Sequence, residues 1–222
     1  MKRDLLWSAD LENKNLSGDD SFGGEGLNLC WQWMGNYNEK FYSLSKEEGL
    51  RLYSMSPQNG AKEVLWNYPN VLTQRLISPD FIATVQLNYS NLDINEYGGF
   101  GLIGKQYAYL AIKRTKTIYK IQFIKSNLED KMTERVEYES FIHMEDKTIL
   151  MQIQFSNEGA KFGILNKRKE FLEIGSFQGE EGTWEDIRLA LFSIATSKEV
   201  TSGYMAYQNF ELKKKENLHQ TL

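Results

Sequence analysis

The sequence predicts an all-β protein in which two antiparallel sheets pack face to face as a β-sandwich. Apolar and polar residues alternate over many short stretches that Gly, Asn, Lys or Glu turns separate, a pattern typical of half-buried strands. The chain also holds 12 tyrosines and 12 phenylalanines but only 3 prolines, and aromatic side chains favour strands. We expect about twelve to fourteen strands and less than about 10% helix, against the usual third. Packing two sheets together buries so many one-sided strands.

Length and composition narrow the class of protein. The 222 residues suffice for one large β domain without disulfides. Cys30 is the single cysteine, which excludes an internal disulfide and suits a reducing compartment. The net charge of −4 comes without a basic stripe, so nucleic acid is not an expected partner. We find no signal peptide and no apolar run long enough to cross a membrane. We therefore expect a cytoplasmic protein without a membrane partner.

The stretch from Phe22 to Ser54 begins the strand pattern. Trp31 and Trp33 are two residues apart, so they share one face of a strand while Gln32 faces the other way. Two interpretations of this pair remain open: packing against the core or sheet face, and a platform for stacking against carbohydrate. Two further short apolar runs, separated by a Lys-Glu-Glu-Gly turn, follow as strands.

The middle of the chain supplies the clearest strands. Residues 61–69 form a loop that carries Trp66 and Tyr68, and residues 71–76 form the next strand. Residues 81–90 alternate most regularly, as expected of a half-buried strand. The predicted core residues of this strand and of a later one are Phe81, Val85, Leu87, Ile149, Met151, Ile153 and Phe155.

Residues 97–104 contain four glycines that could suggest a phosphate-binding loop. No Gly-Lys-Ser/Thr and no strand-to-helix turn follow them, so nucleotide binding is not indicated. Glycine within a strand more often marks a bulge or the close approach of another backbone.

Residues 127–140 fit two patterns. Leu128, Met132 and Val136 are four apart, as on a helix, but Met132, Glu134, Val136 and Tyr138 also alternate as in a strand. We favour the strand because the chain is otherwise β. A meander over 149–174 and strands over 187–192 and 203–212 complete the chain. The predicted organisation is a lead-in segment (1–19), one sandwich (20–212) and a polar tail (213–222).

Catalytic chemistry finds little support in the sequence. Glu137 and Glu139 share a strand face, but so do many solvated charges, and a glycosidase needs two carboxylates at a set separation. His143 and His219 are far apart in the chain, and no Gly-x-Ser-x-Gly occurs, so neither a zinc site nor a Ser-His-Asp triad is indicated. No residue is assigned a catalytic role.

Two further sites are candidates for binding. The carboxylates of Asp19, Asp20 and Glu25 could bind calcium, and no other cofactor is expected. Gln74 and Arg75 are adjacent, so one of them must face the inside or a neighbouring domain. An inward Arg would need a paired acceptor, and both a structural pair and a sugar or domain contact remain open.

Taken in order, several stretches resemble one family, the C-terminal concanavalin A-like sandwich (jelly roll, lectin/glucanase type) of glycoside hydrolase family 43 β-xylosidases and arabinofuranosidases. The similar stretches are Asp20-Ser21-Phe22, Leu29 to Trp33, Phe41 to Leu44, Gly49 to Leu52, Leu72 to Leu76, Gly99 to Leu102, Tyr107 to Leu110, Gly182-Thr183-Trp184 and Gly203-Tyr204 to Phe210. They span residues 20 to about 212. The chain departs from the family in its last strand, where Ala206 and Gln208 replace the usual aspartates, which argues against a cation there.

The resemblance implies an accessory domain, because the catalytic part of these enzymes is a separate five-bladed propeller that precedes the sandwich. In some relatives an aromatic residue of the sandwich reaches the sugar pocket of the propeller, and Trp184 is the residue here that best matches it. An aromatic ring offers C–H contacts to a sugar and excludes water. The candidate binding residues are Trp184, Arg75, Gln74, Trp66 and Tyr107.

Three hypotheses about function follow. The first is a non-catalytic domain that docks on a family 43 propeller and shapes its sugar pocket. The second is an independent module that binds xylo- or arabino-oligosaccharides through loop aromatics such as Trp66, Tyr68 and Trp184. The third, an enzyme on the sandwich itself, is disfavoured because the Glu-x-Asp-x-x-Glu motif of sandwich-fold glucanases is absent.

Overall fold

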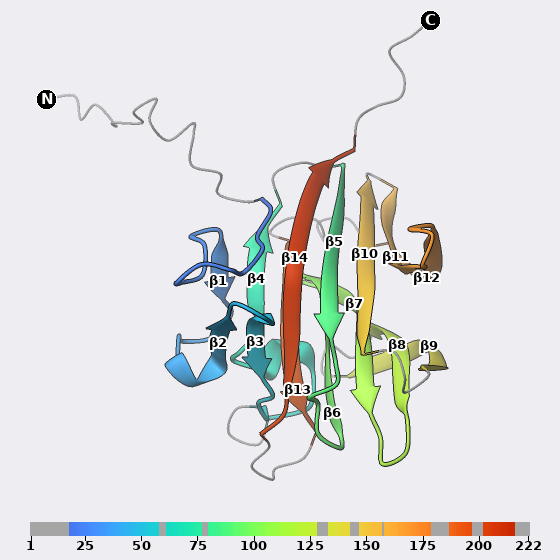
Figure 1. Ribbon diagram of the computed structural model, residues 1–222. Helices are drawn as coiled ribbons and strands as arrows, with labels where there is room; N and C mark the ends of the chain where they lie inside the picture. The colour runs from blue at the N-terminus through green and yellow to red at the C-terminus, as the bar shows by residue number, and fades with distance from the viewer. Residues whose placement is uncertain are drawn as a thin grey trace, which may run out of the picture.

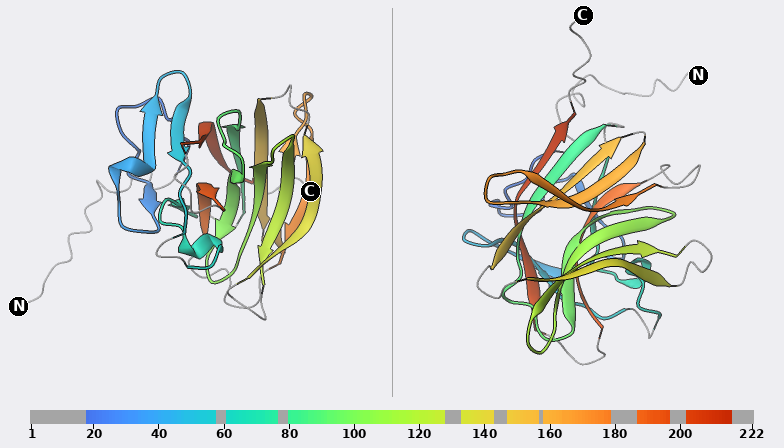
Figure 2. Two further views of the ribbon diagram at one scale, coloured as in Figure 1. Left: turned by 90° about the horizontal axis from the view of Figure 1, so that it is seen from below. Right: turned by 90° about the vertical axis from the view of Figure 1, so that its right-hand side faces the viewer.

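The computed structural model describes residues 18–57, 61–76, 80–127, 133–142, 147–156, 158–178, 187–196 and 202–215. Within them, two antiparallel sheets of seven strands each pack as a sandwich (Figures 1 and 2). The predicted fold class is confirmed.

The first sheet has the order β1 (Trp31–Trp33), β4 (Leu72–Arg75), β13 (Arg188–Ala195), β6 (Glu96–Ile103), β7 (Tyr107–Arg114), β8 (Tyr119–Ser126) and β9 (Glu134–Ile142). The second has the order β12 (Phe171–Phe177), β11 (Gly159–Leu165), β10 (Thr148–Ser156), β5 (Phe81–Asn88), β14 (Tyr204–Lys214), β3 (Gly49–Tyr53) and β2 (Tyr42–Ser45). Figure 1 looks onto the second sheet, with the first behind it.

Helix is almost absent, as the sequence predicts. The described residues contain only two 3₁₀ turns, η2 (Glu39–Phe41) and η4 (Leu65–Asn67). None of these described helices is long and apolar enough to span a membrane. The stretch that fits both a helix and a strand is a strand over Glu134–Ile142, and Leu128 and Met132 lie outside the described residues.

The main core lies between the two sheets and follows the predicted alternation. Successive residues of β5 alternate between buried and half-buried, so its apolar set faces the first sheet. Six of the seven predicted core residues are buried, and Ile149 is half-buried near the end of β10. The predicted inward faces of β5 and β10 are therefore confirmed.

A second, smaller core covers the outer face of the first sheet. Segment 61–71, which contains η4, packs there against β6, β7 and β13. The glycines of β6 make room for it: a Cβ added at Gly101 would lie 2.5 Å from the Cβ of Tyr109 and 2.8 Å from the carbonyl oxygen of Ala108. The glycines therefore mark close approach of neighbouring groups, as the sequence suggests. The members are Leu65, Tyr68, Val71, Tyr97, Ile103, Tyr107, Tyr109, Ala111, Ile124, Ala190, Phe192 and Ile194.

Tyr207 links the two sheets through hydrogen bonds. It belongs to β14 of the second sheet, yet its hydroxyl reaches Phe192 and Gly99, which face each other across β13 and β6 of the first. The oxygen lies 2.5 Å from Phe192 O and 2.9 Å from Gly99 O as acceptors, and it accepts the N–H groups of Gly99 (3.1 Å) and Phe192 (3.3 Å). Burial raises the pKa of Tyr207 well above its usual value, so the hydroxyl keeps its proton.

We expect Tyr207→Phe to lower the free energy of unfolding by about 1–3 kcal/mol, because buried backbone groups lose a hydrogen-bond partner. Urea unfolding measures this change. Tyr204→Phe is the matched control on the same strand, since its half-buried hydroxyl donates to Glu48 Oε2 at 3.1 Å and should contribute less. An equal loss in both variants would contradict the inter-sheet role of Tyr207.

Candidate functional site

Three of the five candidate binding residues lie on one side of the first sheet. Arg75 is exposed on its outer face, and Trp66 and Tyr107 belong to the small core that covers this face. Gln74 points into the sandwich instead. Trp184 lies outside the described residues. The structure therefore brings Trp66, Arg75 and Tyr107 to one sheet face and separates Gln74 from them.

The buried side chain of Gln74 holds the beginning of the domain. Its Nε2 donates to Gly18 O at 3.3 Å and to Cys30 Sγ at 3.1 Å, and its Oε1 accepts the N–H of Gly18 at 3.2 Å. Burial raises the pKa of the Cys30 thiol, which suits the predicted role of a small apolar side chain. One member of the Gln74–Arg75 pair does face inward, and it is the glutamine, whose amide is used within the chain.

Tyr107 belongs to a network of tyrosines around one carboxylate. Tyr107 Oη donates to Glu134 Oε1 at 2.5 Å, and Tyr109 Oη donates to Glu134 Oε2 at 2.7 Å. The N–H of Leu65 in η4 also donates to Glu134 Oε1, at 3.0 Å. Trp66 packs edge-on against Tyr107, with ring centroids 4.5 Å apart, and its Nε1 donates to Gly104 O at 3.0 Å. This network fastens segment 61–71 to the sheet.

The electrostatics of this network are those of a structural cluster. Removal from water raises the pKa of Glu134, and the hydrogen bonds from Tyr107, Tyr109 and Leu65 oppose that rise. Burial also raises the pKa values of Tyr107 and Tyr109, so both remain proton donors. Neither tyrosine is exposed. Tyr107 is consequently a second layer behind Trp66, with no ring face open to a ligand.

The exposed part of this face carries arginines beside a small hollow. Arg75 and Arg188 are opposite each other in the pairing of β4 and β13, and Arg188 Nη1 donates to Gln32 Oε1 at 3.1 Å. A hollow of about 330 Å³ lies next to β1, lined by Met34 and residues of segment 61–71 that include Trp66. A half-buried ring, guanidinium groups and an amide are the groups of a polar binding surface.

The tryptophan pair of β1 has two environments. Trp31 is buried between Phe22 and Phe210, and its Nε1 donates to Asp20 Oδ2 at 2.9 Å. Trp33 is half-buried against Phe41 and Tyr42 at the edge of the sandwich. Packing therefore accounts for the pair, and Trp31 offers no platform for a sugar.

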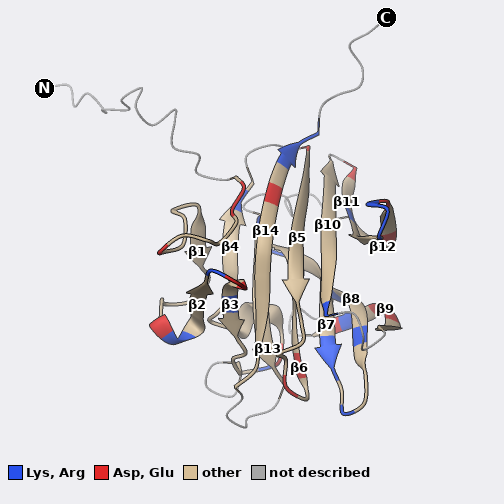
Figure 3. Cartoon of the chain, in the orientation of Figure 1, with Lys and Arg blue, Asp and Glu red and all other residues tan. Residues whose placement is uncertain are grey.

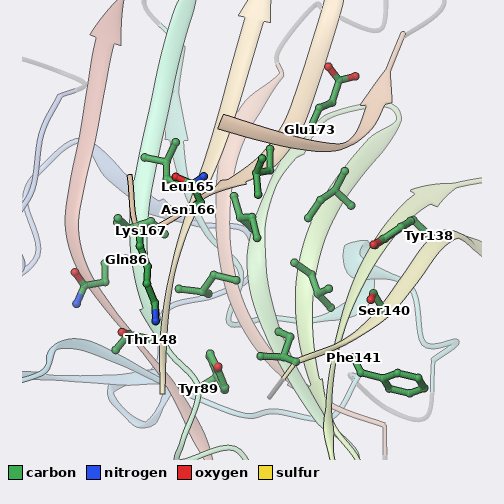
Figure 4. Close-up of a pocket in the computed structure, with 17 residues that line it drawn as sticks. Gln86, Tyr89, Tyr138, Ser140, Phe141, Thr148, Leu165, Asn166, Lys167 and Glu173 are labelled. Atoms are coloured by element: carbon green, nitrogen blue, oxygen red, sulfur yellow. The ribbon is translucent and has the colours of Figure 1, made fainter. Parts of the chain in front are cut away.

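A second concave region opens between the sheets, where β9 faces β11 and β12 (Figure 4). Its volume is about 710 Å³, within the range of ligand sites. Figure 4 shows Tyr138 and Ser140 on one rim and Gln86, Thr148 and Lys167 on the other. The lining is aliphatic between these rims, with Ile121, Ile142, Ile149, Ile164, Leu172 and Ile174.

The described carboxylates do not form a catalytic pair. Glu137 binds Arg135 at 2.5 Å, and Glu139 binds Lys120 at 2.6 Å; these partners lower the pKa values of both glutamates. No three His, Cys, Asp or Glu side chains converge in the described ranges, and Asp20 is occupied by Trp31 and by the N–H of Phe22. The middle strands β5 and β10 of the second sheet carry no charge at all (Figure 3).

Comparison with known proteins decides the family. Residues 19–213 match the profile of the "Beta xylosidase C-terminal Concanavalin A-like domain" (GH43_C2). The chain belongs to this family. No curated protein matches it.

Solved structures of other family 43 proteins share the fold of this C-terminal domain. It superposes with a TM-score of 0.74 on a bifunctional GH43-CE protein of Bacteroides eggerthii, at 24% identity over 90% of this chain and 26% of that one. A xylan β-1,4-xylosidase of Bacillus halodurans C-125 gives 0.71 at 15% identity, over 88% and 39%. A GH43 protein of Bacillus licheniformis gives 0.71 at 16% identity, over 89% and 39%. The chain thus spans a quarter to two fifths of these proteins.

Sequence reasoning missed Arg188, Gln32 and Glu134 as members of these surfaces. Arg188 becomes notable only because β13 pairs with β4, more than 100 residues earlier in the chain. Glu134 carried one usable signal, since it begins an amphipathic strand that faces a tyrosine-rich one. No local pattern predicts the Gln32–Arg188 contact.

We expect the stabilisation by Glu134 to depend on pH. A carboxylate with a raised folded-state pKa favours folding fully below its unfolded pKa and loses that contribution as pH rises through the folded one. The difference in unfolding free energy between the wild type and Glu134→Gln should therefore shrink from about pH 4 to about pH 8. Urea unfolding at several pH values measures it.

Glu137→Gln on the same strand is the control, because the pKa of Glu137 is lowered by Arg135. Its contribution should have the opposite sign, present at neutral pH and lost on acidification, and it should be small because the side chain is exposed. A Glu134 difference that grows with pH would contradict the assignment.

Proposed function

We propose that this chain is a non-catalytic accessory domain of a family 43 glycoside hydrolase, which docks on the catalytic propeller and shapes the mouth of its sugar pocket. One observation supports this most directly. The Bacteroides eggerthii protein is covered to only 26%, although the match takes in 90% of this chain. In that protein the domain accompanies a part about three times its size.

The chemistry of the described residues supports a non-catalytic role. Hydrolysis of a glycosidic bond requires a carboxylic acid and a carboxylate about 5–5.5 Å or about 6.5–9.5 Å apart across the bond. Glu137 and Glu139 are instead each paired with a cation on the exposed edge strand, which keeps both ionised, so neither can donate a proton. Glu134 is enclosed by Tyr107, Tyr109 and Leu65 and has no access to a substrate.

The proposed contribution to the sugar pocket assigns a role to Trp184. Its ring would extend from the segment between β12 and β13 to the rim of the propeller pocket. Trp66 and Arg75, on the outer face of the first sheet, are the described candidates for contacts with the propeller. Gln74 would act indirectly, by fixing Gly18 where the preceding polypeptide joins the domain.

The test is to express this chain and the family 43 propeller of the same organism separately and then mix them. The isolated chain should hydrolyse neither nitrophenyl xyloside nor nitrophenyl arabinofuranoside. Mixing should give a 1:1 complex in size-exclusion chromatography and raise the turnover of the propeller. Trp184→Ala should lower that turnover while leaving the complex and the melting temperature of the chain unchanged.

Two results would refute the proposal. One is turnover by the isolated chain that a carboxylate substitution within it abolishes. The other is the absence of both a complex and any effect on the propeller.

The cleft between the sheets favours a second candidate function, an independent oligosaccharide-binding module. Tyr138 is 43% exposed at its rim, with the amides of Gln86 and Asn166 and the ammonium of Lys167 around the same opening. A ring with surrounding amides and hydroxyls suits a sugar. Segment 61–71 suits it less well, because Tyr68 is fully buried.

Isothermal titration with xylo- and arabino-oligosaccharides tests the module. Millimolar or tighter binding, weakened at least about tenfold by Tyr138→Ala, would support it. Tyr37→Ala is the control, since Tyr37 is 62% exposed and is not in the lining of the cleft. Absence of binding heat would leave the accessory role alone.

A further inference from the structure

Arg75 and Arg188 form a like-charged pair in the middle of the first sheet. They are direct cross-strand partners in the antiparallel pairing of β4 and β13, so their Cβ atoms lie about 4.5–5.5 Å apart on the same face. The face is the outer one, because the next pair along, Thr73 and Ala190, leads into the small outer core. Like charges directly opposite each other destabilise a sheet.

No carboxylate of the described residues neutralises this pair. The ion pairs within the described ranges involve Arg51, Lys120, Arg135, Lys161 and Lys213. The one side-chain hydrogen bond found for the arginine pair joins Arg188 Nη1 to Gln32 Oε1. Gln32 is itself exposed on the outer face. The amide orients one guanidinium but leaves the charge of both uncompensated.

The pair lies beside the point where the polypeptide begins this domain. Gln74, the neighbour of Arg75, holds Gly18 through two hydrogen bonds, and the chain before Gly18 leaves from the same end of β4 in Figure 1. In this family the sandwich is the C-terminal domain, so a catalytic domain would be connected at this point. On the other side, Arg188 faces Ile103 of β6, next to Gly104, which accepts the indole N–H of Trp66.

We infer that Arg75 and Arg188 together bind a carboxylate side chain on the surface of the catalytic propeller, with Gln32 orienting Arg188. This inference rests on the proposed accessory function and names its contact. Guanidinium groups hold carboxylates in planar, bidentate geometry, and two of them side by side can clamp one carboxylate from both sides. Docking then removes the repulsion that the free domain carries.

The test compares the double variant Arg75→Gln/Arg188→Gln with the wild type in the affinity of this chain for the separately expressed propeller. Loss of a clamped carboxylate should weaken the complex at least about tenfold at about 0.15 M salt. Raising the salt concentration should weaken the wild-type complex more than that of the double variant. Arg135→Gln is the matched control on β9 of the same sheet, where Arg135 is already paired with Glu137, and it should bind like the wild type.

The melting temperature of the free chain supplies an independent measurement. Removing one or both like charges should leave it unchanged or raise it, because no stabilising contact is lost. A fall of several degrees would show that a carboxylate of this chain already pairs with the arginines, and would overturn the inference.

The remaining outcomes separate this inference from the function on which it rests. A wild-type chain that neither binds nor affects the propeller refutes both. A propeller that binds the wild type and the double variant equally refutes the arginine clamp and leaves the accessory function standing. If the double variant instead loses affinity only for a xylo-oligosaccharide bearing glucuronate, the carboxylate belongs to a glycan and the propeller contact is wrong.

Discussion

The hydroxyl of Tyr207 is the interaction on which the arrangement of the two sheets depends. Apolar packing between the sheets is strong but non-directional, so it does not by itself fix how the sheets align. Tyr207 extends from β14 and bonds the backbone of Phe192 and Gly99 in adjacent strands of the opposite sheet. A fully buried hydroxyl without these partners would be costly, so sliding of one sheet over the other is penalised. The same contact fixes β13, which carries Arg188.

From β13 outward, each layer of the candidate site is held by the one beneath it. β13 and β6 support the small outer core, where Gly101 leaves space for Tyr109. Tyr107 and Tyr109 then hold Glu134, and Glu134 together with Tyr107 binds the N–H of Leu65. Trp66 is thereby fixed at the surface, near the end of the sheet where Arg75 and Arg188 lie. The exposed residues of the site are thus positioned by buried hydrogen bonds rather than by loop conformation.

The extent to which the sequence predicts this structure follows from the range of the interactions involved. Alternation is local, so the inward faces of β5 and β10 could be assigned, and Ile149 is only half-buried because it lies near a strand end. The orientation of Gln74 and Arg75 could not be assigned, since adjacency alone leaves the parity of a four-residue strand open. Gln74 faces inward because Gly18 and Cys30 offer partners to its amide. The Arg75–Arg188 and Tyr107–Glu134 contacts depend on strand pairing between distant segments, which no local pattern specifies.

The charged residues of the domain differ in a way that bears on its role. Lys120 and Arg135, at the β9 edge, each have a glutamate partner, as expected of a surface exposed to water alone. Arg75 and Arg188 are opposed to each other, in the interior of the sheet, near the buried anchor of Gly18. Stability alone gives no reason to keep two such charges together, because neutral or opposite residues would serve the sheet better. A surface that is unfavourable in the free domain and becomes favourable on contact with an anion is the expected property of a domain that functions against a partner.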